Sequence, residues 1–134
     1  MSSTKEDILR VSLHLFAKDG YEAVSVSQIA GALGMTKGAL YRHYQNKRDI
    51  FLSIVKRMEQ GDTEQAQDHD MPEGEEVDMP EKYDEISLKD FAGYSKSMFL
   101  YWTEDDFASS FRKMLTLEQF RSEEMQQLYQ QYLV

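Results

Sequence analysis

The segment from residue 25 to residue 47 contains two short helical patterns separated by a glycine, and no other part of the chain constrains the fold as strongly. Ser25, with Gln28 three residues later, forms a capping-box pattern at the start of the first helix. Gly34 ends this helix in a turn conformation that a residue with a Cβ resists, and Thr36 can cap the second helix. The inward-facing apolar residues of the pair are Val26, Ile29, Ala30, Leu33 and Leu40. The segment therefore predicts a helix-turn-helix motif.

Two further helices are predicted to pack against this pair. Thr4 can cap a first helix that Gly20 closes, with apolar residues at helical spacing between them. Asn46 opens a fourth helix, which we expect to end near Met58. Because helices joined by short turns can bury a common core, we predict that residues 1–58 form a self-contained helix-turn-helix domain in an all-α fold.

The formal net charge of -9 is distributed unevenly along the 134 residues. Residues 1–58 contain nine Lys and Arg against five Asp and Glu, a balance of +4. Residues 59–134 contain six against nineteen, a balance of -13. This asymmetry says more about partners than the net charge does. We expect the N-terminal part to face phosphate groups and the acidic part to face away from them.

The composition also argues against disulfide, metal and catalytic sites. The chain has no cysteine, which excludes a disulfide framework and a thiolate metal site. Its histidines, His14, His43 and His69, are scattered, and no nucleophile–base pair or glycine-rich phosphate loop accompanies them. We therefore expect no catalytic residue, no metal site and no cofactor, and we expect that the chain is not an enzyme.

Neither a secretory signal nor a membrane span is recognisable in the sequence. Residues 1–7 lack a basic stretch followed by an apolar run. No apolar stretch approaches the roughly 18–20 residues that a helix needs to cross a bilayer. We expect a cytoplasmic protein without membrane contact.

Residues 59–86 interrupt the helical pattern. They contain both prolines of the chain, Pro72 and Pro80, and a run of acidic residues. This composition is typical of a solvated, acidic connector. The alternative is a metal-binding or partner-binding acidic loop around His69.

Helical periodicity returns in residues 87–134, where Thr103 and Ser122 can each cap a further helix. Aromatic and methionine side chains are frequent in this part, and such side chains can line a pocket for an apolar ligand. The candidate lining residues are Met98, Tyr101 and Trp102. The alternative for each of them is a place in the ordinary core.

The second helix of the motif carries groups that suit a DNA duplex. Lys37 adds charge at its N-terminal end, where backbone N–H groups favour phosphate, and Gly38 permits close backbone approach. Tyr41, Arg42 and His43 offer donors for base edges and phosphates. Each residue alone is compatible with an ordinary surface or core position. Their combination on one helix after a glycine turn predicts entry into the major groove.

Residues flanking this helix are predicted to contact the DNA backbone. Lys47, at the start of the fourth helix, is a predicted phosphate clamp, and Ser25 and Ser27 can reach the backbone from the preceding helix. We expect Tyr41 to point outward and Tyr44 to be at least half buried.

A dense set of residues within about residues 5–58 carries a family pattern. These residues are Gly20-Tyr21-Glu22-Ala23, Ser25-Val26, Ile29-Ala30, Gly34, Thr36-Lys37-Gly38, Leu40-Tyr41, His43-Tyr44 and Lys47. In them the sequence resembles the N-terminal domain of the tetracycline-repressor (TetR/AcrR) family. The resemblance implies base-reading contacts for the third helix, from Thr36, Lys37, Gly38, Tyr41, Arg42 and His43, with Lys47 on phosphate. Val24 and Ser27 depart from the pattern, because the family often has threonine and a longer polar or basic side chain there.

The resemblance further implies a divergent effector-binding and dimerisation domain after the fourth helix, which we assign to residues 87–134. Members usually dimerise through their last two helices, and we expect this chain to end before them, as a truncated or a naturally short member. The implied function is a ligand-responsive repressor that binds a palindromic operator in double-stranded DNA as a homodimer and responds to a small apolar effector. The alternative is a DNA-binding interaction protein whose helical body contacts a protein partner.

Overall fold

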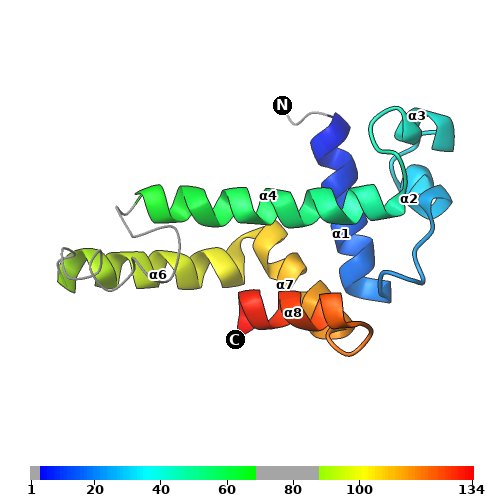
Figure 1. Cartoon of the computed structure of the whole chain (residues 1–134). Coiled ribbons are helices and arrows are strands. Elements are labelled where there is room, and N and C mark those ends of the chain that lie inside the picture. The colour runs from blue at the N-terminus through cyan, green and yellow to red at the C-terminus, as the bar shows by residue number, and fades with distance from the viewer. Residues whose placement is uncertain (1–3, 69–87) are drawn as a thin grey trace.

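The computed structural model describes residues 4–68 and 88–134, and all regular elements in those ranges are α-helices, which confirms the predicted all-α fold (Figure 1). The helices are α1 (Thr4–Asp19), α2 (Val26–Ala32), α3 (Lys37–Tyr41), α4 (Lys47–Asp68), α6 (Leu88–Glu104), α7 (Asp106–Glu118) and α8 (Glu123–Leu133). Within the described ranges, no helix combines the length and the apolar character needed to cross a membrane.

The predicted caps of α2, α3 and α4 are present, whereas Thr4, the predicted cap of α1, is itself the first residue of that helix. Ser25 Oγ accepts a hydrogen bond from the Gln28 amide at 3.1 Å, and Thr36 Oγ1 accepts one from the Ala39 amide at 3.1 Å. Asn46 Oδ1 caps α4 by accepting from the amide of Asp49 at 2.8 Å. These side chains satisfy amides at the helix starts that have no partner within the helix.

Two glycines lie where only a left-handed backbone lets the chain turn. Gly20 has φ 91° after α1, and Gly34 has φ 67° between α2 and α3. Residues with a Cβ adopt such angles at a cost of roughly 1 kcal/mol, so both positions favour glycine. The turn expected at Gly34 is thereby confirmed.

α3 is shorter and α4 is longer than the sequence predicted. α3 ends at Tyr41 rather than near Tyr44, because the Tyr44 side chain turns back to α1, where it is only 5% exposed and donates a hydrogen bond to the Lys5 carbonyl at 3.0 Å. α4 continues past the expected end near Met58 to Asp68, with α6 packed along its second half. The rest of the predicted connector, including His69, lies outside the described residues.

The cap of α7 also differs from the prediction. Thr103 remains inside α6, where its hydroxyl donates to the Phe99 carbonyl at 2.7 Å. Asp105 caps α7 instead, since its carboxylate accepts a hydrogen bond from the Ala108 amide at 2.9 Å. The predicted cap at Ser122 is confirmed, because its hydroxyl accepts from the Met125 amide at 3.1 Å.

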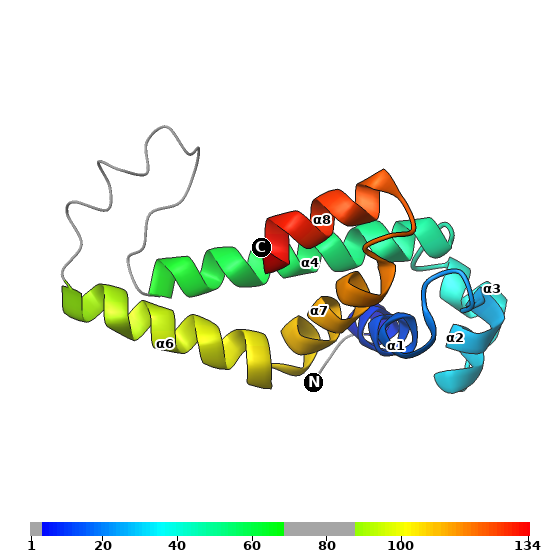
Figure 2. The same cartoon turned by 90° about the horizontal axis from the view of Figure 1, so that it is seen from below.

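One hydrophobic core runs through both halves of the molecule. α7 packs on α1, α6 and α8, and α1 also packs on α2 and α4. The apolar residues that are 0% exposed come from α1, α2, α3, α4 and α7: Ile8, Leu13, Phe16, Ile29, Leu40, Ile50, Ile54, Met58, Ala108, Phe111, Met114 and Leu115. α2 and α3 lie at one end of the molecule, and the start of α6 lies at the other (Figure 2). Because the core is continuous, the position of α2 and α3 depends on the helices of the body.

Candidate nucleic-acid interface

The α2–α3 pair rests on a closely packed base. Ile29 and Leu40 are 0% exposed, and Ala30 and Val24 are 2% and 1% exposed. Side chains this deeply buried fix the helix that carries them, because moving them would open cavities in the core. The outer face of α3 is therefore presented by a rigid support.

Eight of the nine residues predicted to contact DNA are exposed on the outside of this support. They are Ser25, Ser27, Thr36, Lys37, Gly38, Tyr41, Arg42 and His43. The expected orientation of the two tyrosines is confirmed, since Tyr41 is 43% exposed and Tyr44 is 5% exposed. We call this set of eight exposed residues, which belong to α2, α3 and the segments beside them, the α3 face.

The α3 face is free of negative charge. The stretch from Ser25 to Arg48 contains four Lys and Arg and no Asp or Glu. Within the described part of the chain, neither Lys37 nor Arg42 forms an ion pair. Unpaired cations on an acid-free surface attract a polyanion and release its counterions on contact.

Lys47 has a different environment from the eight exposed residues. Its side chain is half-buried, and its Nζ donates hydrogen bonds to the carbonyls of Tyr21 at 2.8 Å and Val24 at 3.2 Å. The same ammonium lies 4.2 Å from the centroid of the Tyr21 ring. Lys47 therefore holds the turn between α1 and α2, and because an ammonium has three N–H donors, one remains for a phosphate.

Arg48 is a contact residue that sequence reasoning missed. Its guanidinium makes two hydrogen bonds to Glu124 of α8, at 3.1 and 2.7 Å. These hydrogen bonds lower the pKa of the Glu124 carboxyl. No sequence signal indicates this pair, because its partners are 76 residues apart and meet only through the fold.

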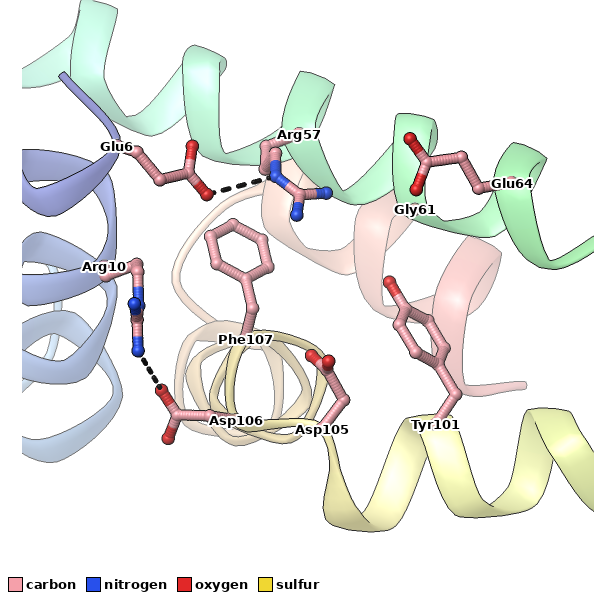
Figure 3. A pocket seen from close by; sticks show the side chains of 9 residues that line it. All are labelled: Glu6, Arg10, Arg57, Gly61, Glu64, Tyr101, Asp105, Asp106 and Phe107. Atoms are coloured by element: carbon pink, nitrogen blue, oxygen red, sulfur yellow. Dashed lines mark hydrogen bonds and ion pairs between the residues drawn. The ribbon is translucent and has the colours of Figure 1, made fainter. Parts of the chain in front are cut away.

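A hollow of about 300 Å³ lies between the N-terminal domain and the body (Figure 3). Its walls come from α1, α4, α6, α7 and the α6–α7 junction: Glu6, Arg10, Arg57, Gly61, Glu64, Tyr101, Asp105, Asp106 and Phe107. Arg57 Nε pairs with Glu6 at 3.2 Å, and Arg10 pairs with Asp106 at 3.9 Å. The walls of the hollow are mostly charged, with Tyr101 and Phe107 as their aromatic parts.

Of the three predicted pocket residues, only Tyr101 lines this hollow. Its ring reaches across to α4, where its hydroxyl lies against Gly61, so a side chain at position 61 would collide with it (Figure 3). Trp102 is half-buried in an aromatic cluster, with its ring 6.2 Å from Tyr132 and 5.3 Å from the Arg112 guanidinium. Met98 is half-buried on α6.

A polar group with a shifted pKa lies next to Tyr101. Burial, with a smaller contribution from Glu59, raises the pKa of Asp62 to about 6. Burial and then the charge of Asp62 raise the pKa of Tyr101 to about 12. Within the described part of the chain, Asp62 Oδ1 and the Tyr132 hydroxyl are buried without a hydrogen-bond partner.

The described residues contain no group of three or more His, Cys, Asp or Glu that could hold a metal ion.

Comparison with known proteins gives matches for the N-terminal half. Residues 8–54 match the family model described as bacterial regulatory proteins, tetR family. An uncharacterized HTH-type transcriptional regulator, YerO of Bacillus subtilis, is 42% identical over 56 residues, which cover 42% of this chain and 19% of that protein.

Two named regulators are also similar. The HTH-type transcriptional regulator AcrR of Shigella flexneri is 43% identical over 51 residues, or 38% of this chain and 24% of AcrR. The HTH-type transcriptional repressor AcnR of Corynebacterium glutamicum is 26% identical over 90 residues, or 66% of this chain and 48% of AcnR. The matched segment thus spans less than half the length of each of these relatives.

Proposed function

Since the chain belongs to the TetR family of bacterial regulatory proteins through its residues 8–54, we propose that it is a DNA-binding transcriptional regulator. In this proposal the α3 face enters the major groove of double-stranded DNA. Tyr41, Arg42 and His43 read base edges there, and Lys37 and Lys47 contact phosphates. Such a regulator acts in the cytoplasm of a bacterium.

The single observation that carries the proposal is the accessibility of an acid-free, cationic α3 face on a rigid support. Tyr41 is 43% exposed, whereas Tyr44 three residues later is buried. The body of the chain is strongly acidic, so it repels the duplex and leaves the α3 face as the surface to approach DNA.

The bound form is proposed to be a homodimer on a palindromic operator. One helix-turn-helix makes few phosphate contacts, so a single copy binds weakly at physiological salt. A two-fold dimer places two α3 faces about 34–36 Å apart, which matches half-sites one helical turn apart. The operator then has inverted half-sites.

Effector control is proposed to act through the hollow between α1, α4, α6 and α7. A small molecule bound there touches Glu6 and Arg10 of α1 together with Arg57 of α4, so it can shift the angle between the N-terminal domain and the body. The charged walls favour an effector with polar groups and an apolar part that packs on Tyr101 and Phe107. This differs from the small apolar effector that the sequence suggested.

A second candidate function is supported by the exposed apolar side chains of the body. On α6, Leu88 is 84% exposed, Phe91 is 46% exposed and Phe99 is 67% exposed, and their spacing places them along one face of the helix. A run of exposed apolar side chains on one face is typical of a surface that contacts another protein. In this alternative the body binds a protein partner and no small effector exists.

Selection from a random pool of duplexes tests the function. We expect enrichment of one sequence with inverted half-sites, bound with an affinity that falls as salt rises. Recovery of no preferred duplex would contradict DNA-binding regulation. With the selected duplex, titration of small molecules distinguishes the two alternatives, because only a ligand-responsive regulator loses operator affinity when a molecule occupies the hollow.

A further inference from the structure

The turn between α1 and α2 is held from the side of the body by a buried carboxylate. Glu118, the last residue of α7, is 1% exposed, and its Oε1 accepts a hydrogen bond from the backbone amide of Tyr21 at 2.8 Å. Its Oε2 pairs with Arg121 at 3.4 Å. A buried carboxylate is costly unless it is paired and hydrogen-bonded, and Glu118 has both partners.

The geometry around Gly20 depends on the same carboxylate. A Cβ built on Gly20 would lie 3.2 Å from Glu118 Oε1, closer than most Cβ contacts allow. The left-handed backbone at Gly20 turns the next amide, that of Tyr21, toward Glu118. The absence of a side chain at this position thus permits the close approach of the turn to the α7–α8 corner, residues 118–122 (Figure 2).

The turn is held from its other side by α4. Lys47 donates to the carbonyls of Tyr21 and Val24, and the Tyr21 ring packs edge-on against Phe16 and Phe51, at 5.0 and 5.5 Å between ring centroids. The N-cap of α2, Ser25, follows directly after Val24. Whatever fixes this turn therefore fixes the start of the helix-turn-helix.

We propose that Glu118 is a positioning residue for DNA binding: through the Tyr21 amide it ties α2 to the α7–α8 corner. This inference rests on the proposed function, and it adds a hydrogen bond to the turn before α2 to the other connections between domain and body, which are the packing of α1 on α7 and the Arg48–Glu124 pair. A movement of the α7–α8 corner is transmitted to α2 through one short hydrogen bond, without passing along α4. Spatial continuity alone does not establish coupling, so the connection needs a direct measurement.

The test compares Glu118→Leu with Glu118→Gln, because glutamine keeps an oxygen that can accept the Tyr21 N–H and leucine does not. In Glu118→Leu the Tyr21 amide loses its acceptor, and a shift of the turn toward solvent lets water take the place of that acceptor. Because DNA binding needs the original position of the turn, the free energy of this shift is subtracted from the free energy of binding. We expect Glu118→Leu to bind the operator duplex selected from a random pool about ten-fold more weakly, and Glu118→Gln to stay within about two-fold of the unchanged chain.

Arg121→Ala is the matched control. It removes the ion pair with Glu118 and leaves the hydrogen bond to Tyr21 in place, so its operator affinity is expected to stay within about two-fold. Thermal unfolding of every variant establishes that binding is measured well below the unfolding midpoint. A purely structural role for Glu118 would lower that midpoint and leave the affinity of the folded protein unchanged.

A second measurement needs no variant. Coupling is reciprocal, so if the Glu118–Tyr21 contact favours operator binding, operator binding must stabilise the contact. Hydrogen exchange of the Tyr21 amide in the unchanged chain is therefore expected to slow about ten-fold with the selected duplex and to change little with a random duplex.

Wild-type operator affinity in folded Glu118→Leu would overturn the inference, and so would Tyr21 exchange that is unaffected by the operator. The exchange measurement decides the question if Glu118→Leu does not fold. If the unchanged chain prefers no duplex at all, the proposed function fails first, and this inference fails with it. That outcome is recognised from the selection alone.

Discussion

Lys47 and Lys37 are two cations of the same domain that the structure places in different roles, and replacing each by methionine separates these roles. Methionine keeps the apolar stem of the side chain and removes only the ammonium group. Lys37 is exposed and makes no ion pair within the described residues, whereas Lys47 bonds the Tyr21 and Val24 carbonyls at 2.8 and 3.2 Å. Lys37→Met is therefore the matched control for Lys47→Met.

The expected loss of stability follows from the contacts of the Lys47 ammonium. A hydrogen bond from a charged donor contributes about 1.5–3 kcal/mol, and a cation over an aromatic ring about 0.5–1 kcal/mol. Because Lys47 is only half-buried, water can hydrate the freed carbonyls and offset much of this loss. We expect Lys47→Met to lower the free energy of unfolding by about 2 kcal/mol, or the melting temperature by about 8 °C. Lys37→Met is expected to change the free energy of unfolding by less than about 0.5 kcal/mol.

The assay pairs urea unfolding with operator binding at several salt concentrations. Each replacement is expected to lower the slope of log affinity against log salt by about one, because each removes one phosphate contact. Equal free energies of unfolding for the two variants would refute the stabilising role of the bonds from Lys47 to the carbonyls of the turn. An unchanged salt slope for Lys47→Met would remove its phosphate role and leave it a structural residue only.

Four further replacements probe the α3 face, the turn between α2 and α3, and the polar group beside Tyr101. Tyr41→Ala and Arg42→Ala should each weaken operator binding by about 1–3 kcal/mol, as measured by fluorescence anisotropy. Both side chains are exposed, so the melting temperature should change little, and a large drop in it would indicate a packing role instead. Gly34→Ala should destabilise the chain by about 1 kcal/mol in urea, because φ is 67° and no atom lies near the new Cβ; unchanged stability would show that the turn has another conformation. The pKa of Asp62 is raised to about 6 from an ordinary 3.8, so the folded state binds its proton more tightly than the unfolded state, and stability should fall as pH rises from about 4 to about 6. Asp62→Asn should remove most of this pH dependence and stabilise the chain at pH 7 by about 1 kcal/mol, a value reduced because Asp62 is partly exposed to water. If the stability of Asp62→Asn depended on pH as that of the unchanged chain does, the assignment of this dependence to Asp62 would be wrong.

Local signals in the sequence were sufficient to predict where α2, α3 and α4 begin. The caps at Ser25, Thr36 and Asn46 depend on a hydroxyl or amide three residues before an amide of the same turn, so they are readable from spacing. The opposite orientations of Tyr41 and Tyr44 do not follow from helical periodicity, because residues three apart share a helix face; they arise because α3 ends at Tyr41 and the Tyr44 side chain turns back to α1.

The end of α4 could not be read in the same way. Residues after Met58 are polar, and their composition suggests a connector, yet they form helix up to Asp68 because α6 packs alongside. Gly61, normally unfavourable inside a helix, is the position where the Tyr101 hydroxyl lies against α4. Tertiary packing has overridden local preference here.

The connections between domain and body were equally invisible in the sequence. The Glu118 carboxylate and the Tyr21 amide are 97 residues apart, and Arg48 and Glu124 are 76 apart. Charge patterns alone do not pair residues over such separations. The candidate pocket residues show the same limit, since Tyr101 lines the hollow and Trp102, its neighbour, packs in an aromatic cluster.

Protection of guanine N7 from methylation tests the placement of the α3 face in the major groove most directly, because N7 lies on the major-groove edge of the base. The measurement uses the duplex selected from a random pool, with the unchanged chain and with Arg42→Ala. We predict that the unchanged chain protects N7 within each half-site and that Arg42→Ala loses protection at one position of each. Full methylation of N7 throughout a duplex that the chain occupies would contradict major-groove docking of α3.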